Sequence, residues 1–235
     1  MADLFERALT ERRAGSSLAV EIEGSDRPPL PQPLDWHLRV AGAVPLADVA
    51  ALEWVSGTVI DVGCGTGRHL ETLAARGVSG YGVEISPAAV AHARAAGVTC
   101  HEADLWTFRP QDPVSSVLAL GGNGGLAQTF ERLPSFLRRL SSWLVPGGTI
   151  VFTSLDYRYA PRVVQRSSSG PVSGRYPGDW RLRFRLGDAA GEWFPWLMTD
   201  TDTLAAVCAT HQLRVEKVQQ WNNSPSYGAL LRKVS

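Results

Sequence analysis

The sequence predicts an α/β protein built on a doubly wound, mostly parallel sheet of seven strands. Three observations predict this fold. Short β-branched apolar runs alternate with helical runs over residues 55–154, one of these strands runs straight into a glycine-rich turn, and polar residues follow the ends of other strands. With 235 residues, of which 44% are hydrophobic, the chain can form one such domain with appendages.

We expect four segments in chain order. An N-terminal helix and lid occupy residues 1–54, the ligand-binding core 55–154, a cap insertion with a β-hairpin 155–198, and the C-terminal helix with the closing strands of the core 199–235. The N-terminal segment opens with apolar side chains at helical spacing, which predict a short amphipathic helix. They are Leu4, Phe5, Ala8 and Leu9.

The rest of the N-terminal segment is less regular. Residues 18–22 suit a short strand, four prolines between positions 28 and 33 exclude regular helix, and Asp35-Trp36-His37 follows. An apolar helix over about 45–54 then leads into the core. We expect this segment to cover a bound ligand or to pack on the sheet.

The first core strand, Thr58–Val62, runs into Gly63, Gly65 and Gly67. Glycine permits a positive φ and close approach of the backbone to a ligand, and the helix beginning at the next residue offers unpaired N–H groups to an anion. The dinucleotide pattern G-x-G-x-x-G would need a glycine where Arg68 stands, which disfavours NAD.

The helix after this turn should bury one face and stop at a glycine. Leu70, Leu73 and Ala74 mark that face, and Gly77 suits the stop.

The second strand, Gly80–Ile85, ends in Glu84, 17 residues after the last of the three turn glycines. An acidic residue at this position can accept hydrogen bonds from both ribose hydroxyls of a nucleotide-type ligand. Ser86 suits an N-cap and Pro87 the first position of a helix that Gly97 ends.

The third strand, Val98–Ala103, ends in Asp104, which could accept a hydrogen bond from the exocyclic amine of adenine. The fourth, Val114–Leu120, ends in the glycine-rich run 121–125 around Asn123. Close backbone approach is expected there, and the Asn123 amide suits the amino-acid end of a cofactor or an acceptor substrate.

An amphipathic helix is expected next, broken by Pro146-Gly147-Gly148, and Thr149–Thr153 forms the fifth strand. The apolar face of this helix consists of Leu133, Phe136, Leu137, Leu140 and Leu144.

Two motifs carry a resemblance to a known family. The D-x-G-x-G-x-G run from Asp61 resembles the first motif of the class I S-adenosylmethionine-dependent methyltransferases, and the L-x-P-G-G turn from Leu144 resembles their last shared motif. The resembling positions span residues 59–153, about two fifths of the chain. The resemblance implies a Rossmann-like fold and S-adenosylmethionine as cofactor, with S-adenosylhomocysteine as product. The cofactor-binding residues implied are Asp61, Gly63, Cys64, Gly65, Gly67, Glu84, Ile85, Asp104, Leu105, Gly121 and Asn123.

The cap insertion begins irregularly over 155–179, where residues 167–170 suggest a mobile loop. Strict alternation over Trp180–Leu186 and a turn before 192–198 then predict a hairpin that caps the site. Its expected inward residues are Leu182, Phe184 and the cluster 193–196. Its opposite face carries Arg181, Arg183 and Arg185. These arginines form either a solvated charged face or a contact with an anionic substrate group or a second subunit.

A final helix over about 201–211, capped by Asp200 or Thr201, should bury Leu204, Val207 and Cys208. Two closing antiparallel strands are expected over 213–221 and 226–234.

Absent patterns narrow the expected substrate. The fourth strand ends without the Asp/Asn-Pro-Pro-aromatic signature of nucleic-acid and protein amide methyltransferases and without a carboxylate pair for a metal. We therefore expect metal-free, in-line methyl transfer to a small molecule, as in the methyltransferases of bacterial secondary metabolism that such sequences resemble.

Composition indicates the setting. Lys+Arg and Asp+Glu are equal at 23 each, so no overall field draws the chain to nucleic acid or a membrane. Without a signal peptide or spanning run, the chain reads as cytoplasmic, as a monomer or homodimer. Three scattered cysteines indicate neither a disulfide framework nor a zinc site, and Cys64 serves as a small side chain.

Candidates for a general base are His37, Tyr157 and Tyr159, which could fold over the crevice. His37 is preferred because its ordinary pKa of ~6.5 lets it accept a proton near neutral pH, whereas the pKa of a tyrosine lies near ~10. Two alternative functions remain open: a non-catalytic S-adenosylmethionine-binding module, which a turnover assay would distinguish, and an NAD(P)-linked oxidoreductase, which a nicotinamide-cofactor titration would test.

Overall fold

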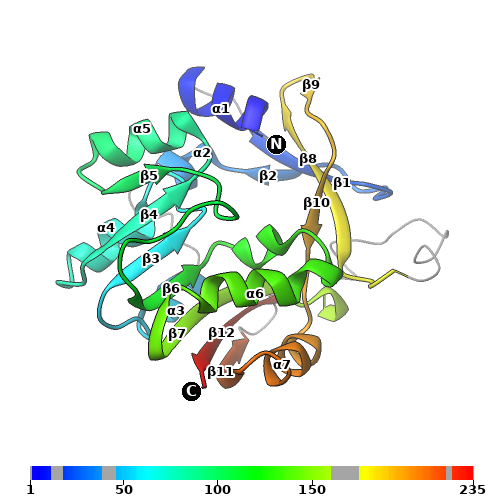
Figure 1. Ribbon diagram of the computed structural model, residues 1–235. Coiled ribbons are helices and arrows are strands. Elements are labelled where there is room, and N and C mark those ends of the chain that lie inside the picture. Colours follow the sequence, from blue (N-terminus) through cyan, green and yellow to red (C-terminus); the bar gives the residue numbers. More distant parts are fainter. Residues whose placement is uncertain (1, 12–17, 39–45, 160–174, 221–223, 235) are drawn as a thin grey trace.

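The computed structural model (Figure 1) describes residues 2–11, 18–38, 46–159, 175–220 and 224–234. The elements of the first half are α1 (Ala2–Glu11), β1 (Leu18–Ile22), β2 (Leu30–Gln32), α2 (Leu34–Leu38), α3 (Leu46–Leu52), β3 (Val59–Val62), α4 (Arg68–Ala74), β4 (Gly80–Glu84), α5 (Pro87–Ala95), β5 (Cys100–Glu102) and β6 (Val114–Ala119). Those of the second half are η1 (Asn123–Ala127), η2 (Phe130–Arg132), α6 (Leu133–Ser141), β7 (Leu144–Leu155), η3 (Tyr157–Tyr159), β8 (Asp179–Leu186), β9 (Ala189–Ala190), β10 (Phe194–Leu197), α7 (Thr201–Ala209), β11 (Leu213–Gln220) and β12 (Ser226–Lys233).

The larger sheet has seven strands in the order β11-β12-β7-β6-β3-β4-β5. Neighbours from β7 to β5 are parallel, while β12 is antiparallel to both β7 and β11. The expected doubly wound sheet and closing pair are therefore confirmed. The chain passes from β3 to β4 and β5 on one side and continues at β6 on the other. In such sheets the ligand crevice lies at the carboxyl ends of the strands where the order reverses, here β3 and β6.

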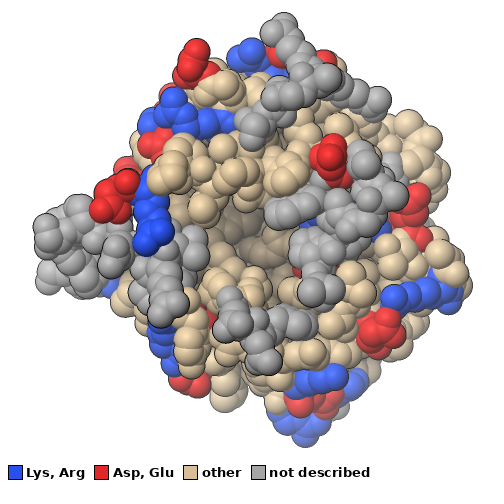
Figure 2. Space-filling model, turned by 180° about the vertical axis from the view of Figure 1, so that it is seen from behind, with Lys and Arg blue, Asp and Glu red and all other residues tan. Residues whose placement is uncertain are grey.

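A second, smaller sheet has the order β10-β8-β1-β2, with β9 paired to β8. Strand β1 is antiparallel to β8, with Leu18 opposite Leu186, and β10 pairs with the other edge of β8. The smaller sheet therefore contains more than the expected hairpin. The hairpin is present, but the free edge of β8 hydrogen-bonds with β1, so the N-terminal segment and the cap form one sheet. Figure 2 shows the molecule hollowed near its centre.

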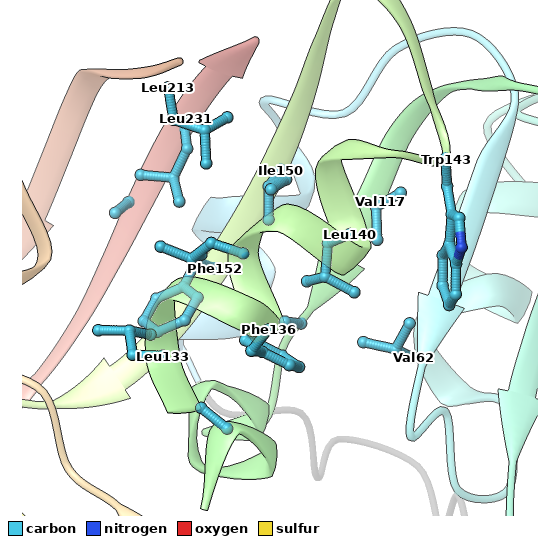
Figure 3. Packing of buried hydrophobic residues seen from close by; sticks show 14 of the residues in the cluster. Val62, Val117, Leu133, Phe136, Leu140, Trp143, Ile150, Phe152, Leu213 and Leu231 are labelled. Carbon is cyan, nitrogen blue, oxygen red and sulfur yellow. The ribbon is translucent and has the colours of Figure 1, made fainter. Parts of the chain in front are cut away.

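Two apolar layers hold helices on both faces of the larger sheet. On one face, α6 places Phe136 and Leu140 against Val117 of β6 and Ile150 of β7 (Figure 3). On the other face, α3, α4 and α5 pack on the sheet through a second cluster that includes Leu73. These layers fix the strand ends that form the crevice.

Local details differ from expectation in two places. Leu144 lies in β7 and not on the helix, because the strand begins before the Pro-Gly-Gly turn and absorbs it through a register shift between Val114 and Ser116. On α4, Ala74 is exposed and His69 is buried with Leu70 and Leu73.

Other local expectations agree. Ser86 caps α5, its side chain accepting from the Ala89 N–H, and Asp200 caps α7. Leu204 and Cys208 of α7 are buried as expected, and Val207 is partly buried. The expected mobile loop around 167–170 lies outside the described residues. Across the described ranges, each helix is too short or too polar to cross a membrane.

Candidate active site

The glycine turn after β3 has the backbone that its sequence predicts. Gly63, Gly65 and Gly67 have φ values of 63°, 55° and 87°, in the left-handed region that side chains disfavour. The Asn123 amide of η1 donates hydrogen bonds of 2.9 Å to the carbonyls of both Val62 and Gly63. Asn123, expected on a ligand, thus ties the end of β6 to the end of β3.

Glu84 meets this turn from the end of β4. Its carboxylate accepts hydrogen bonds from the N–H groups of Gly65 at 2.9 Å, Ile85 at 2.8 Å and Ser86 at 2.9 Å. Burial raises the pKa of Glu84, while the three N–H donors favour the ionised form. Gly65 and Glu84, which are 19 positions apart in the sequence, are therefore in direct contact.

The remaining predicted ligand residues lie around this crevice. Ile85 follows β4 and is 61% exposed despite being apolar. Exposed Asp104 follows β5 and accepts from the Trp106 N–H at 2.8 Å, next to buried Leu105. Gly121 follows β6, and its N–H donates to Asp48 Oδ1 at 2.9 Å.

The side chain of Cys64 is buried. Its Sγ lies 3.4 Å from Sγ of buried Cys100 on β5. A Cβ on Gly82 would come within 2.2 Å of Cys64 Sγ, so the glycine of β4 makes room for the thiol. Hydrogen bonding with Cys100 and burial raise the pKa of Cys64, which remains a thiol.

A buried charged cluster under the glycine turn was not predicted. His69 Nδ1 lies 3.2 Å from Asp61 Oδ2, and His69 Nε2 lies 3.3 Å from Asp48 Oδ2. Arg68 also donates to Asp48 Oδ2 at 3.2 Å. We call Asp48, Asp61, Arg68 and His69 the Asp-His cluster. It joins α3, β3 and α4, and through the N–H of Gly121 it also holds the end of β6.

The cluster fixes the charge of its histidine. Burial alone would lower the pKa of His69, but the hydrogen bonds that its ring donates to Asp48 and Asp61 raise it to about 9, so the ring is an imidazolium at neutral pH. Asp61 is fully buried, and its Oδ1 has no hydrogen-bond partner among the described residues. The sequence offered no signal for Asp48, because α3 precedes the motif and carries no fixed spacing to it.

His37, the preferred base, lies beside the glycine turn. Its carbonyl accepts a hydrogen bond from the Thr66 hydroxyl, and its ring meets the edge of Phe5 with ring centres 5.1 Å apart. Burial, aided by the positive charge of Arg68, lowers the pKa of His37 to about 4. The imidazole is therefore neutral at neutral pH, and its Nε2 is buried without a partner in the described structure.

The tyrosines after β7 differ from each other. Tyr157 packs edge-on against Tyr176 with ring centres 5.4 Å apart. Burial and the negative charge of Asp200 raise the pKa of Tyr157, so its hydroxyl stays protonated and can donate a hydrogen bond. Tyr159 is exposed.

The smaller sheet brings an aromatic side chain to the crevice. The indole of Trp196 on β10 lies against Gly125 of η1, where a Cβ would come within 2.1 Å of the ring. Trp193 was expected inward with it but lies against Arg183, whose guanidinium is 4.4 Å from the Trp193 ring centre. The alternation of strand side chains explains the split, since positions 193 and 196 differ by an odd number.

The three arginines of β8 face carboxylates within their own sheet. Arg183 and Arg185 pair with Glu21 of β1 at 2.8 and 2.9 Å, and Arg181 pairs with Glu23 at 2.8 Å. These contacts support the charged-face interpretation of this side of the cap.

Comparison with known proteins finds likenesses to methyltransferases. A family model described as "Methyltransferase domain" matches residues 59–148. A dTDP-3-amino-3,4,6-trideoxy-alpha-D-glucopyranose N,N-dimethyltransferase of Streptomyces venezuelae is 32% identical over 96 residues, which is 40% of each chain. A dTDP-4-amino-2,3,4,6-tetradeoxy-D-glucose N,N-dimethyltransferase of Saccharopolyspora spinosa is 27% identical over 67% of this chain and 68% of its own.

The likeness of the fold extends further than that of the sequence. A crystal structure of an S-adenosylmethionine-dependent methyltransferase from Bacteroides fragilis, in complex with S-adenosyl-L-homocysteine, aligns with a TM-score of 0.79 at 25% identity. The alignment covers 98% of this chain and 92% of that one. The sheet order, the glycine turn and these matches agree over the core. Residues 59–148 therefore form a methyltransferase domain, and the chain has the fold of the class I S-adenosylmethionine-dependent methyltransferases.

Proposed function

We propose that the protein transfers the methyl group of S-adenosylmethionine to a small-molecule acceptor and releases S-adenosylhomocysteine. One observation carries the proposal: the glycine turn, Glu84, Asp104 and the run after β6 all lie at the carboxyl ends of adjacent strands, on both sides of the order reversal. The two curated relatives support it. The match to the first of them spans only 40% of its length, so the activity and the acceptor are both part of the proposal.

The residues at the crevice fit this cofactor. Glu84 would accept hydrogen bonds from the ribose hydroxyls, and exposed Ile85 would pack against the adenine ring beside Asp104 and Leu105. The turn glycines and Gly121 leave room for the amino-acid end. Asp61 Oδ1 is buried and has no described hydrogen-bond partner. It would therefore accept a hydrogen bond from the ammonium group of the cofactor, directly or through water.

The chain's own contribution to the reaction is positioning. S-adenosylmethionine, when bound, supplies an electrophilic methyl group on a sulfonium. The crevice and the smaller sheet would hold the acceptor atom in line and exclude water, an effect that supplies up to roughly 7–11 kcal/mol in favourable cases. His37 would accept a proton from acceptors that remain protonated, and Tyr157 would donate a hydrogen bond.

The finer expectations belong to the same proposal. We place the acceptor among the products of bacterial secondary metabolism, and exclude nucleic acid, metal and membrane from the reaction. We further propose that the protein acts in the cytoplasm, as a monomer or homodimer. Light scattering of the purified chain measures its oligomeric state.

Replacing Glu84 by alanine is expected to weaken binding of S-adenosylhomocysteine roughly ten- to hundredfold, because a charge-assisted contact of about 1.5–3 kcal/mol is lost. Isothermal titration calorimetry measures the change. Glu102 lies opposite Glu84 on β5 and is exposed, so Glu102→Ala is the matched control and should leave the affinity unchanged. Unchanged affinity in Glu84→Ala would count decisively against the ribose assignment.

Catalysis itself needs a separate test. The protein is incubated with S-adenosylmethionine and a panel of bacterial metabolites, and mass spectrometry follows the gain of one methyl group by an acceptor and the formation of S-adenosylhomocysteine. Binding without turnover across the panel would favour a binding module over an enzyme.

A further inference from the structure

Five rings form a continuous row along the inner side of the smaller sheet. Phe5 of α1 contacts both His37 of α2 and Phe184 of β8, with ring centres 5.1 and 5.9 Å apart. Phe194 of β10 continues the row, 5.5 Å from Phe184 and 6.1 Å from Trp196. We call these five side chains the aromatic row.

Both ends of the aromatic row rest on the glycine segments of the crevice. At one end, the His37 carbonyl accepts a hydrogen bond from Thr66 in the turn after β3. At the other end, Trp196 lies on Gly125, after β6. These are the two strands between which the sheet order reverses, so the row spans the crevice from one glycine segment to the other.

Charged side chains of the same sheet lie on its other side. Alternation along β8 separates Arg183 from Phe184, and Arg183 and Arg185 share the carboxylate of Glu21. Where the wall of the central hollow is drawn in colour, it is mostly tan and so consists mainly of residues other than Lys, Arg, Asp and Glu (Figure 2). A diphosphate group binds most strongly to arginine pairs, and the β8 arginines are directed away from the aromatic row.

We infer that the acceptor is an uncharged, ring-containing molecule whose ring packs against the aromatic row, and not a nucleotide-diphosphate sugar of the kind named for the two relatives. This inference rests on the proposed methyl transfer. Flat or alicyclic rings bury apolar surface and stack favourably on aromatic side chains. A dianionic phosphate would lose its hydration there, and Arg68, the described cation whose charge reaches His37, already donates to the buried carboxylate of Asp48.

The test uses the full chain saturated with S-adenosylhomocysteine and a matched ligand pair, 1-naphthol and 1-naphthyl phosphate, titrated by calorimetry. Naphthol is expected to bind at least tenfold more tightly than its phosphate. Trp196→Leu should weaken naphthol binding about three- to tenfold, the ratio that one aromatic contact supplies. Trp193→Leu, three positions earlier and stacked on Arg183, is the control and should leave it unchanged.

Three outcomes would overturn the inference: tighter binding of the phosphate, equal losses in the Trp193 and Trp196 variants, or no naphthol binding by a protein that binds S-adenosylhomocysteine. Should Trp196→Leu not fold, Phe194→Leu takes its place, with circular dichroism and the affinity for S-adenosylhomocysteine as checks of folding. Failure of the parent chain to bind S-adenosylhomocysteine would instead contradict the proposed function.

Discussion

Replacing His69 by alanine is expected to lower the free energy of unfolding by about 3–5 kcal/mol, the range observed when one partner of a buried ion pair is removed. The substitution leaves two buried carboxylates, Asp48 and Asp61, without the imidazolium that lies between them. Urea denaturation followed by circular dichroism measures the change. Exposed His101→Ala on β5 is the control and should cost less than about 1 kcal/mol.

The same cluster predicts the pH dependence of stability. The pKa of His69 is about 9 in the folded chain and about 6.5 in an unfolded one, so its contribution is fully present below pH 6.5 and is lost as the pH rises through 9. A difference of this size corresponds to roughly 3 kcal/mol. The free energy of unfolding is measured against pH for the parent and for His69→Gln. Subtracting the second profile from the first removes the contributions of the other titrating groups. Parallel profiles for the two chains would show that His69 is not an imidazolium in the fold.

Replacing His37 by alanine is expected to lower the rate of methyl transfer ~10²-fold or more for an acceptor that must lose a proton. Because the pKa of His37 is held near 4, the base form persists across the neutral range, and the parent rate should show no decline around pH 6.5. Single-turnover transfer to the acceptor found in the panel, measured from pH 5 to 8, gives the profile.

A second substitution separates proton transfer from packing at His37. His37→Phe keeps a ring beside Phe5 but has no basic nitrogen, so it should be as slow as His37→Ala while retaining affinity for S-adenosylhomocysteine within about threefold. Transfer at the parent rate by His37→Phe would reduce His37 to a member of the aromatic row. Positioning alone would then be the working mechanism.

The sequence predicts structure well where the pattern that identifies an element lies within a short stretch of the chain. The strand running into Gly63, the acidic end of β4 and the Ser86-Pro87 start of α5 depend on neighbours in the chain, so their patterns predicted the larger sheet and the arrangement of its strand ends. The L-x-P-G-G turn is expected between helix and strand, but it lies inside β7, which already begins at Leu144. Leu144 is assigned to the helix because an apolar residue at such a boundary fits both periods.

The sequence was least informative where side chains meet across long separations. Nothing near Asp61 indicates that His69 will bridge it to Asp48, and nothing in β1 indicates that its partner is β8. Asn123 is a further example of a contact between distant positions that its neighbours in the sequence do not indicate. Its amide was assigned to a ligand because glycines surround it, yet its donors bind the carbonyls of the neighbouring strand end.

The smaller sheet also has a consequence for how the chain folds. Glu21 of β1 and Arg183 of β8 are 162 positions apart, and the whole methyltransferase domain lies between them. During synthesis, β1 emerges early and has no partner on β8 until most of the chain has been made, while the contacts of β3, β4 and β5 are far more local. The larger sheet should therefore fold first and the smaller sheet close last. Pulsed hydrogen exchange during refolding would show late protection of the amides of β1, and the crevice would acquire its aromatic wall only in that final step.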